Sequence, residues 1–182
     1  GLSVVTAIAS YAGKPLHIRH NGRETKAAAL IDSQHYTIAP PGRLPLRRLR
    51  FSLVDVPDLT LAPKLWPQIQ SHWMGAAPQP AVLHRALSSL AWLVRLRLLP
   101  TLKPFAQLFH RVLSALRWGD KRGGMFMEVK GATHAGETVT RSWHVIAEGD
   151  DGPFIPSIPA SVIVRKCLDG ILPELGARAC TN

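Results

Sequence analysis

Helical and strand periodicity follow each other between residues 81 and 146, which read AVLHRALSSLAWLVRLRLLPTLKPFAQLFHRVLSALRW at 81–118 and MFMEVKGATHAGETVTRSWHVI at 125–146. The first run is apolar over most of a helical circumference. Pro100 and Pro104 divide it into two helices, because proline lacks an amide proton and clashes with the preceding turn. In the second run apolar and polar residues alternate on both sides of a short polar turn, which predicts a β-hairpin.

The chain before this stretch begins with a helical pattern and a tight turn. Residues 2–12 place their apolar side chains on one helical face, and Gly13 follows at a position typical of a left-handed cap. Alternation resumes at Leu16, and Asn21-Gly22 tolerates positive φ at both central turn positions. We therefore predict a helix that ends at Gly13 and a hairpin over about 15–30.

Prolines are frequent between Ser33 and Pro80, so only short strands are expected there, at His35–Ala39, Phe51–Val56 and Ile69–Gly75. After the second hairpin, a helix is expected from Pro159 to Asp169, with Gly170 as its stop signal. This order predicts a single α+β domain over 1–182, with a mainly antiparallel sheet, a helix pair inserted at about 81–118, and flanking terminal helices.

Composition is that of a globular domain, with 46% hydrophobic and 19% charged residues in 182. The two cysteines, Cys167 and Cys180, form no disulfide framework and are expected to be ordinary thiols. Residues 1–12 lack the basic start and the cleavage site of a signal peptide, and no uncharged apolar run has the length of a membrane span. These features together predict a cytoplasmic protein.

Basic residues dominate the chain, whose formal net charge is +10, and no Asp or Glu occurs between Leu59 and Gly119. A solvated basic face explains this pattern, as does a surface for an acidic partner, anionic lipid headgroups or nucleic acid. The motifs of known nucleic-acid-binding modules are absent, so no nucleic-acid partner is expected. Contact with a membrane surface stays open as an alternative.

No cofactor or metal motif is present. The chain has no G-x-G-x-x-G after a strand, no phosphate loop, no H-E-x-x-H and no G-x-S-x-G. His17 and His20 point to opposite faces of the expected strand, and the acids Glu148, Asp150 and Asp151 match no calcium-loop spacing. We therefore expect this fragment to bind no cofactor and no metal.

Arg141 is the unusual residue of the second hairpin, because it falls in the otherwise apolar row Val139, Trp143 and Val145. Its guanidinium either lies in a cleft, ready for a carboxylate or phosphate, or snorkels outward and pairs with Glu128 across the hairpin. Both interpretations stay open at this point.

Residues 123–170 resemble the C-terminal part of bacterial saccharopine-dehydrogenase-like proteins. The resemblance is carried by Gly123-Gly124-Met125, Arg141-Ser142-Trp143-His144, Ala147–Pro156 (AEGDDGPFIP) and Arg165-Lys166 before Gly170. A further segment, Ala9–Pro15 (ASYAGKP), looks like the junction that follows the nucleotide-binding domain of that family, and Asp55–Leu59 is a weaker match.

The resemblance implies an enzyme of two parts, a Rossmann domain that binds NAD(P) and an α+β domain that closes the substrate cleft and often forms the dimer. This chain is then expected to be the second part, inactive without its missing N-terminal Rossmann domain and forming a homo-oligomer. The resemblance assigns no catalytic residue. Candidate substrate-binding residues are Arg122, Arg141, Asp151 and Gly152. The alternative is a non-catalytic assembly domain that docks through the basic apolar helices at 81–118.

Overall fold

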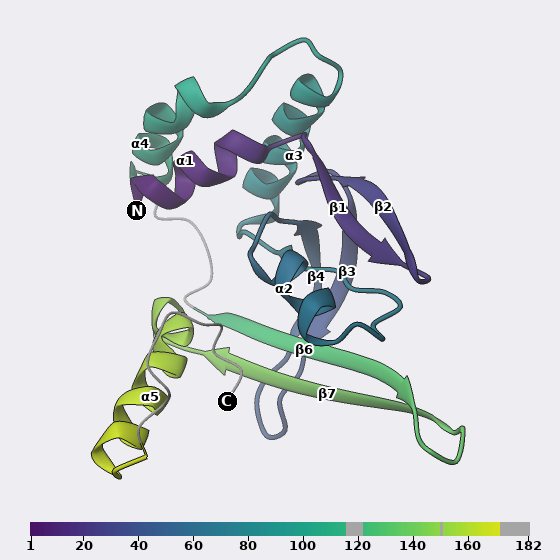
Figure 1. Ribbon diagram of the computed structural model, residues 1–182. Helices are drawn as coiled ribbons and strands as arrows, with labels where there is room; N and C mark the ends of the chain where they lie inside the picture. The colour runs from purple at the N-terminus through teal and green to yellow at the C-terminus, as the bar shows by residue number, and fades with distance from the viewer. Residues whose placement is uncertain (116–121, 150, 172–182) are drawn as a thin grey trace. The chain divides into compact units, whose positions relative to one another are not determined.

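The computed structural model describes residues 1–115, 122–149 and 151–171 (Figure 1). The helices are α1 (Leu2–Tyr11), α2 (Asp58–Leu65), α3 (Ala81–Arg95), α4 (Ala106–Ala115) and α5 (Ile158–Leu168), with 3-10 turns η1 (Lys103–Phe105) and η2 (Gly152–Ser157). The strands are β1 (Pro15–His20), β2 (Arg23–Ala28), β3 (Ser33–Ile38), β4 (Leu46–Leu53), β5 (Gly75–Ala76), β6 (Gly123–Ala132) and β7 (Thr138–Ala147).

The strands form three small sheets in the described residues, ordered β1–β2, β3–β4–β5 and β6–β7. The pairings β1–β2, β4–β5 and β6–β7 are antiparallel. The predicted α+β class with mainly antiparallel strands is therefore confirmed. None of the described helices combines the length and apolar character needed to cross a bilayer.

The chain divides into two compact units. Unit 1 comprises Gly1–Thr37 and Arg47–Asp120, and unit 2 comprises Ile38–Leu46 and Lys121–Asn182. The core of unit 1 lies where α1 packs on α3, η1 and α4 (Figure 1). Small residues allow the helices to approach closely, and larger apolar side chains close the edges of the cluster. The buried members are Ala9, Ala12, Leu30, Ala91, Val94, Leu102 and Ala106.

Helix α1 ends as its sequence predicts. Ala12 caps it, and Gly13 follows with a φ of 72°. The glycine is required by packing as well as by its dihedral angle, since a Cβ there would lie 2.2 Å from the carbonyl oxygen of Ala91 in α3. Near this end of α1, burial together with the charge of Asp55 raises the pKa of Tyr11 to about 12.

The first hairpin is confirmed, with its turn at Asn21-Gly22. Asn21 and Gly22 both have positive φ, at 50° and 75°, and His20 pairs with Arg23 across them. This is the conformation that a two-residue turn needs to match the twist of the flanking strands.

The proline-rich segment departs from expectation in three places. The strand expected at Phe51–Val56 is β4, which covers Leu46–Leu53 and so begins five residues earlier. Residues 58–65, for which we predict no element, form α2, because Pro57 stands at the N-cap and Asp58 in the first turn, positions that helices tolerate or favour. The strand expected at Ile69–Gly75 is wrong except at its last residue. Residues 69–74 instead make isolated backbone hydrogen bonds to the first hairpin. The Gly22 N–H donates to the Gln70 carbonyl at 2.7 Å, and the His72 N–H donates to the Arg19 carbonyl at 3.0 Å.

The helix pair is confirmed as α3 and α4, and residues 116–118 lie outside the described part. Its apolar face is more covered than the sequence suggests. Val94 is buried, and Leu87 and Leu90 pack against the core of unit 1. Exposed large apolar residues lie near the end of α3 and in the connection to α4, and others lie at the start of α3 and on α4. The latter are Val82, Leu108, Val112 and Leu113.

In unit 2 the second hairpin and the last helix are confirmed. Strands β6 and β7 pair without a break from Gly123 opposite Ala147 to Ala132 opposite Thr138. Helix α5 ends one residue before Asp169, and Gly170 follows with a φ of 76°. All described side chains of α5 are at least partly exposed, among them Val164 and Leu168.

Candidate functional site at the base of the hairpin

The start of β6 and the end of β7 meet at one end of the second hairpin, and we call this end the hairpin base. The register places Gly123 opposite Ala147, and Glu148 follows directly in the chain. A Cβ built on Gly123 would lie 3.8 Å from the Cα of Gly152, so the start of η2 also reaches this end. Segments separated by more than twenty positions in the sequence are therefore neighbours here.

The short segment 39–45, which also belongs to unit 2, is bound to the hairpin base by three polar contacts. The Ala39 N–H donates to Nδ1 of His144 at 3.4 Å, and Nη1 of Arg122 donates to the Leu44 carbonyl at 3.4 Å. Nη1 of Arg43 forms an ion pair with Oε2 of Glu148 at 3.3 Å. Because the Nδ1 of His144 accepts a hydrogen bond, the proton of the neutral ring is on Nε2.

Packing at the base depends on a glycine and a ring pair. A Cβ at Gly124 would lie 2.8 Å from the carbonyl oxygen of Val145 and 3.1 Å from Cδ1 of Ile38, which is buried. The rings of Phe126 and His144 stack across the hairpin with centroids 5.9 Å apart and planes 14° apart. The imidazole is thus held by a ring on one side and a backbone donor at its edge, which fixes its orientation.

Three of the four candidate residues lie at this base. Arg122 is half-buried beside Leu44, Gly152 opens η2 next to Gly123, and Asp151 is the exposed N-cap of that turn. The backbone carbonyl of Asp151 accepts a hydrogen bond from the Phe154 N–H at 3.0 Å. Asp150, the middle acid of this loop, lies outside the described residues.

Arg141 is separated from the other candidates. It lies opposite Val129, six positions along β7 from Ala147, which is about 20 Å along a strand. Its side chain is exposed, and Glu128 lies opposite Ser142 and forms an ion pair with Lys130 at 3.1 Å. No ion pair between Arg141 and Glu128 occurs in the described part of the chain.

Arg141 shares its face of the hairpin with a row of exposed apolar side chains, and we call this surface the apolar hairpin face. Opposite residues of an antiparallel pair lie on the same side of the sheet. The face therefore combines the exposed residues Met125, Met127, Val129 and Trp143 with Arg141.

A serine–histidine pair that the sequence did not indicate lies inside unit 1. Oγ of Ser52 in β4 and Nε2 of His84 in α3 are 2.7 Å apart, and the two residues are 0% and 2% exposed. Burial, and then the charge of Arg50, lower the pKa of His84. A serine hydroxyl beside a neutral imidazole is the arrangement of a nucleophile and its general base. A substrate, however, has no access to the fully buried hydroxyl of Ser52. The pair instead joins the sheet to α3.

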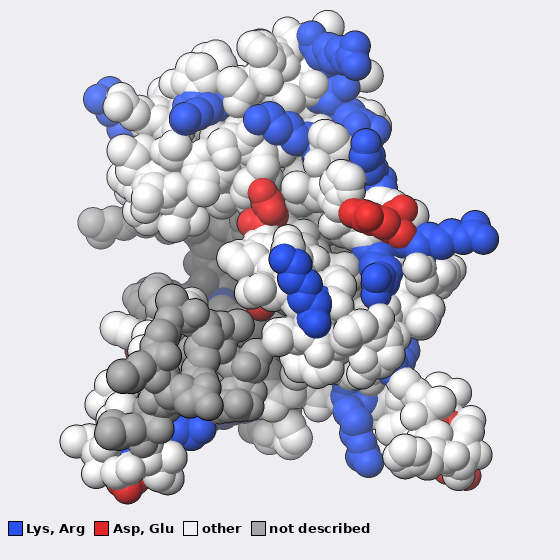
Figure 2. All heavy atoms as spheres, in the orientation of Figure 1, with Lys and Arg blue, Asp and Glu red and all other residues white. Residues whose placement is uncertain are grey.

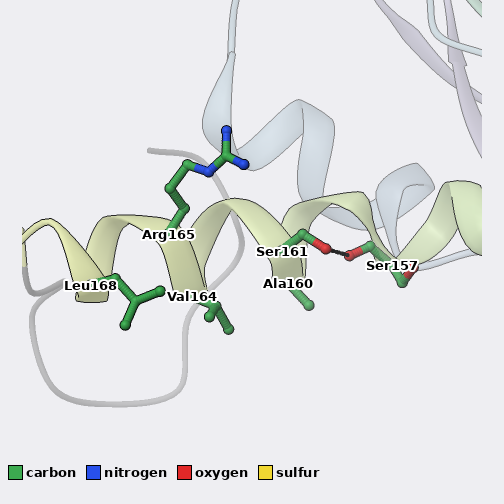
Figure 3. A pocket seen from close by; sticks show the side chains of 6 residues that line it. All are labelled: Ser157, Ala160, Ser161, Val164, Arg165 and Leu168. Atoms are coloured by element: carbon green, nitrogen blue, oxygen red, sulfur yellow. Dashed lines mark hydrogen bonds between the residues drawn. The ribbon is translucent and has the colours of Figure 1, made fainter.

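Two hollows on unit 2 lie along α5. The larger has a volume of about 420 Å³ and is lined by Ser157, Ala160, Ser161, Val164, Arg165 and Leu168 (Figure 3). Its described lining comes from this helix and the residue before it, and Arg165 is its sole charged member. In the described residues no three His, Cys, Asp or Glu side chains are grouped to hold a metal ion.

Comparison with known proteins gives no match to a family model, a curated protein or a solved structure. The geometry of the described residues makes the hairpin base the candidate site. It gathers the guanidinium groups of Arg43 and Arg122, the carboxylate of Glu148 and the oriented imidazole of His144. Guanidinium groups bind carboxylates and phosphates in pairs of hydrogen bonds, so the base suits an anionic substrate group.

Proposed function

We propose that this chain is the substrate-side and dimerisation domain of a saccharopine-dehydrogenase-like NAD(P)-dependent oxidoreductase, and that the missing Rossmann domain binds the cofactor. One observation carries the proposal. Three segments of the family resemblance, at 123–125, 141–144 and 147–156, lie on β6, β7 and the η2 loop, and two of them meet at the hairpin base. The polar groups gathered there would hold the anionic part of the substrate.

The first prediction is that the chain binds neither NADH nor NADPH. A pyrophosphate is normally held by a glycine-rich turn at the start of a helix, and the sequence contains no such motif. Calorimetric titration should give no saturable heat at micromolar cofactor. The same titration on a chain extended by the residues encoded upstream of Gly1 should give one. A saturable site on residues 1–182 would refute the domain assignment, as would an upstream sequence without a strand followed by G-x-G-x-x-G.

A non-catalytic assembly domain is the second candidate function, and the apolar hairpin face favours it. Met127 and Trp143 lie opposite each other in this face, and each is about half exposed. Exposed aromatic and methionine side chains beside an arginine are the residue types that protein interfaces concentrate.

If this face joins two copies, changing Met127→Lys together with Trp143→Ser should convert a dimer to a monomer in sedimentation velocity. The matched control is Lys130→Met with Thr140→Val, an opposed pair on the other face of the same strands. The control should leave the dimer intact. A wild-type chain that stays monomeric at high concentration would exclude self-association, and a dimer that survives the Met127 and Trp143 changes would place the contact elsewhere.

A further inference from the structure

The end of α3 and its connection to α4 form a surface that is both apolar and basic, and we call it the α3–α4 tip. Its apolar members are Trp92, Leu96, Leu98 and Phe105, which are 48%, 60%, 68% and 43% exposed. Arg95, Arg97 and Lys103 lie among them and are exposed. In Figure 2, Lys and Arg side chains gather at the top of the view, over this connection, and no Asp or Glu side chain lies beside them.

The backbone of the tip is held in a defined conformation. The Leu98 N–H donates to the Leu93 carbonyl at 2.9 Å, and the Arg97 N–H donates to the Val94 carbonyl at 3.0 Å. Arg97 has a φ of 60°, so these bonds form a Schellman cap with Arg97 at the left-handed position. Glycine is the residue favoured there, because any Cβ is strained at positive φ. The chain keeps a long cation at a position where the backbone alone prefers glycine.

The exposed leucines are additional to those that the core uses. Leu102, on the same connection, is buried in the core of unit 1, and Leu99 packs against that core. Leu96 and Leu98 point away from it and are mostly exposed. The connection therefore satisfies its own packing and still presents apolar side chains to the outside, which costs free energy in water unless they meet another apolar phase.

We propose that the α3–α4 tip binds the surface of an anionic lipid bilayer. A bilayer supplies both complements that the tip requires, since anionic headgroups attract the cations and the acyl boundary accepts the leucines. Tryptophan is enriched at that depth of a membrane. A second copy of the chain is a poor match because it would bring like charges together, and the leucines would have no partner on a nucleic-acid backbone.

Sedimentation with vesicles tests this proposal on the whole chain. The chain should sediment with vesicles of equimolar phosphatidylglycerol and phosphatidylcholine and remain in solution with phosphatidylcholine alone. Arg95→Glu with Lys103→Glu should weaken binding by at least about 25-fold, because each cation near an anionic surface raises the membrane affinity roughly fivefold. The control, Arg23→Glu with Lys26→Glu on the exposed strand β2, makes the same change in net charge and should retain most of the binding.

The apolar contribution has its own matched pair. Leu96→Ser with Leu98→Ser should weaken binding by at least about tenfold, because the buried area of two leucines is lost. Val82→Ser is the control, since Val82 is 70% exposed at the other end of α3, about 15 Å from Trp92 along the helix. The control should bind as the wild type does.

Arg97→Gly separates binding from folding. Glycine relieves the strain of the left-handed position, so the thermal midpoint should stay level or rise, while vesicle binding should fall by roughly fivefold. Loss of binding without loss of stability supports the proposal. Equal loss in the Arg23 and Lys26 control, equal binding to neutral vesicles, or binding to an oligonucleotide in place of vesicles would overturn it. So would a dimer that the Leu96 and Leu98 changes dissociate while the wild type ignores vesicles.

Discussion

Changing Gly13→Ala should lower the free energy of unfolding by about 2–5 kcal/mol, the largest single-residue effect expected here. The new methyl group would lie 2.2 Å from the carbonyl oxygen of Ala91, a backbone atom in a packed helix. Overpacking of this kind costs about 1–3 kcal/mol, and a Cβ at positive φ adds about 1–2 kcal/mol. Denaturant unfolding followed by circular dichroism measures the loss.

Gly22→Ala is the matched control, because it shares the backbone conformation without the rigid obstacle. Gly22 has a φ of 75°, and a Cβ there would meet only the end of the flexible Gln70 side chain. Its effect should be about 1–2 kcal/mol, from the dihedral angle alone. If the two variants lost equal stability, close packing of α1 against α3 would not be the reason for Gly13.

The second large effect is expected at the buried hydrogen bond between Ser52 and His84. His84→Leu should cost about 2–3 kcal/mol, because the hydroxyl of Ser52 would stay buried without a partner. Adding Ser52→Ala to that variant removes the stranded hydroxyl and should restore part of the loss. If the loss of unfolding free energy in the double variant equalled the sum of the losses in His84→Leu and Ser52→Ala, the two side chains would not be acting as a pair.

The same pair makes stability depend on pH. The pKa of His84 is lowered in the folded chain, whereas the unfolded chain binds this proton near the ordinary value of 6.5. Between these two values the unfolded state holds more protons, so the free energy of unfolding should fall as pH drops below about 6.5, by at most about 1.4 kcal/mol per pH unit. In the double variant this contribution should vanish. The difference in unfolding free energy between the wild type and the double variant should therefore change from pH 7 to pH 5. A constant difference would show that His84 is not the source of this pH dependence.

Local patterns predicted those parts of the fold that depend on neighbouring residues. The cap at Gly13, the Asn21-Gly22 turn, the second hairpin and the helix before Gly170 each have a signal within a few positions, and each is confirmed. Local patterns do not predict α2, because frequent prolines favour only short strands in this segment. In the structure Pro57 stands at the N-cap of α2 and Pro63 lies near its end.

Contacts between distant residues had no such signal. Ala39 and His144 are 105 positions apart, as are Arg43 and Glu148, and nothing in either segment indicates the other. The resemblance led to Arg122, Asp151 and Gly152, which lie together at the hairpin base. Its motif at 141–144 contains His144, but the contact of His144 with Ala39 and the place of Arg43 come from the structure. Arg141 was selected for its place in an apolar row, a criterion that says nothing about its distance from the other candidates.

The packing of α1 also has a consequence for synthesis on the ribosome. Within unit 1, α1 is made before the segments it packs on, because its buried residues Ala9 and Ala12 rest on Ala91, Leu102 and Ala106. A helix of ten residues is marginal in water without tertiary partners. The nascent chain therefore carries α1 without its partners until α4 has left the exit tunnel. Its apolar side chains stay exposed throughout that interval, so α1 is the part of unit 1 whose folding waits longest for its partners.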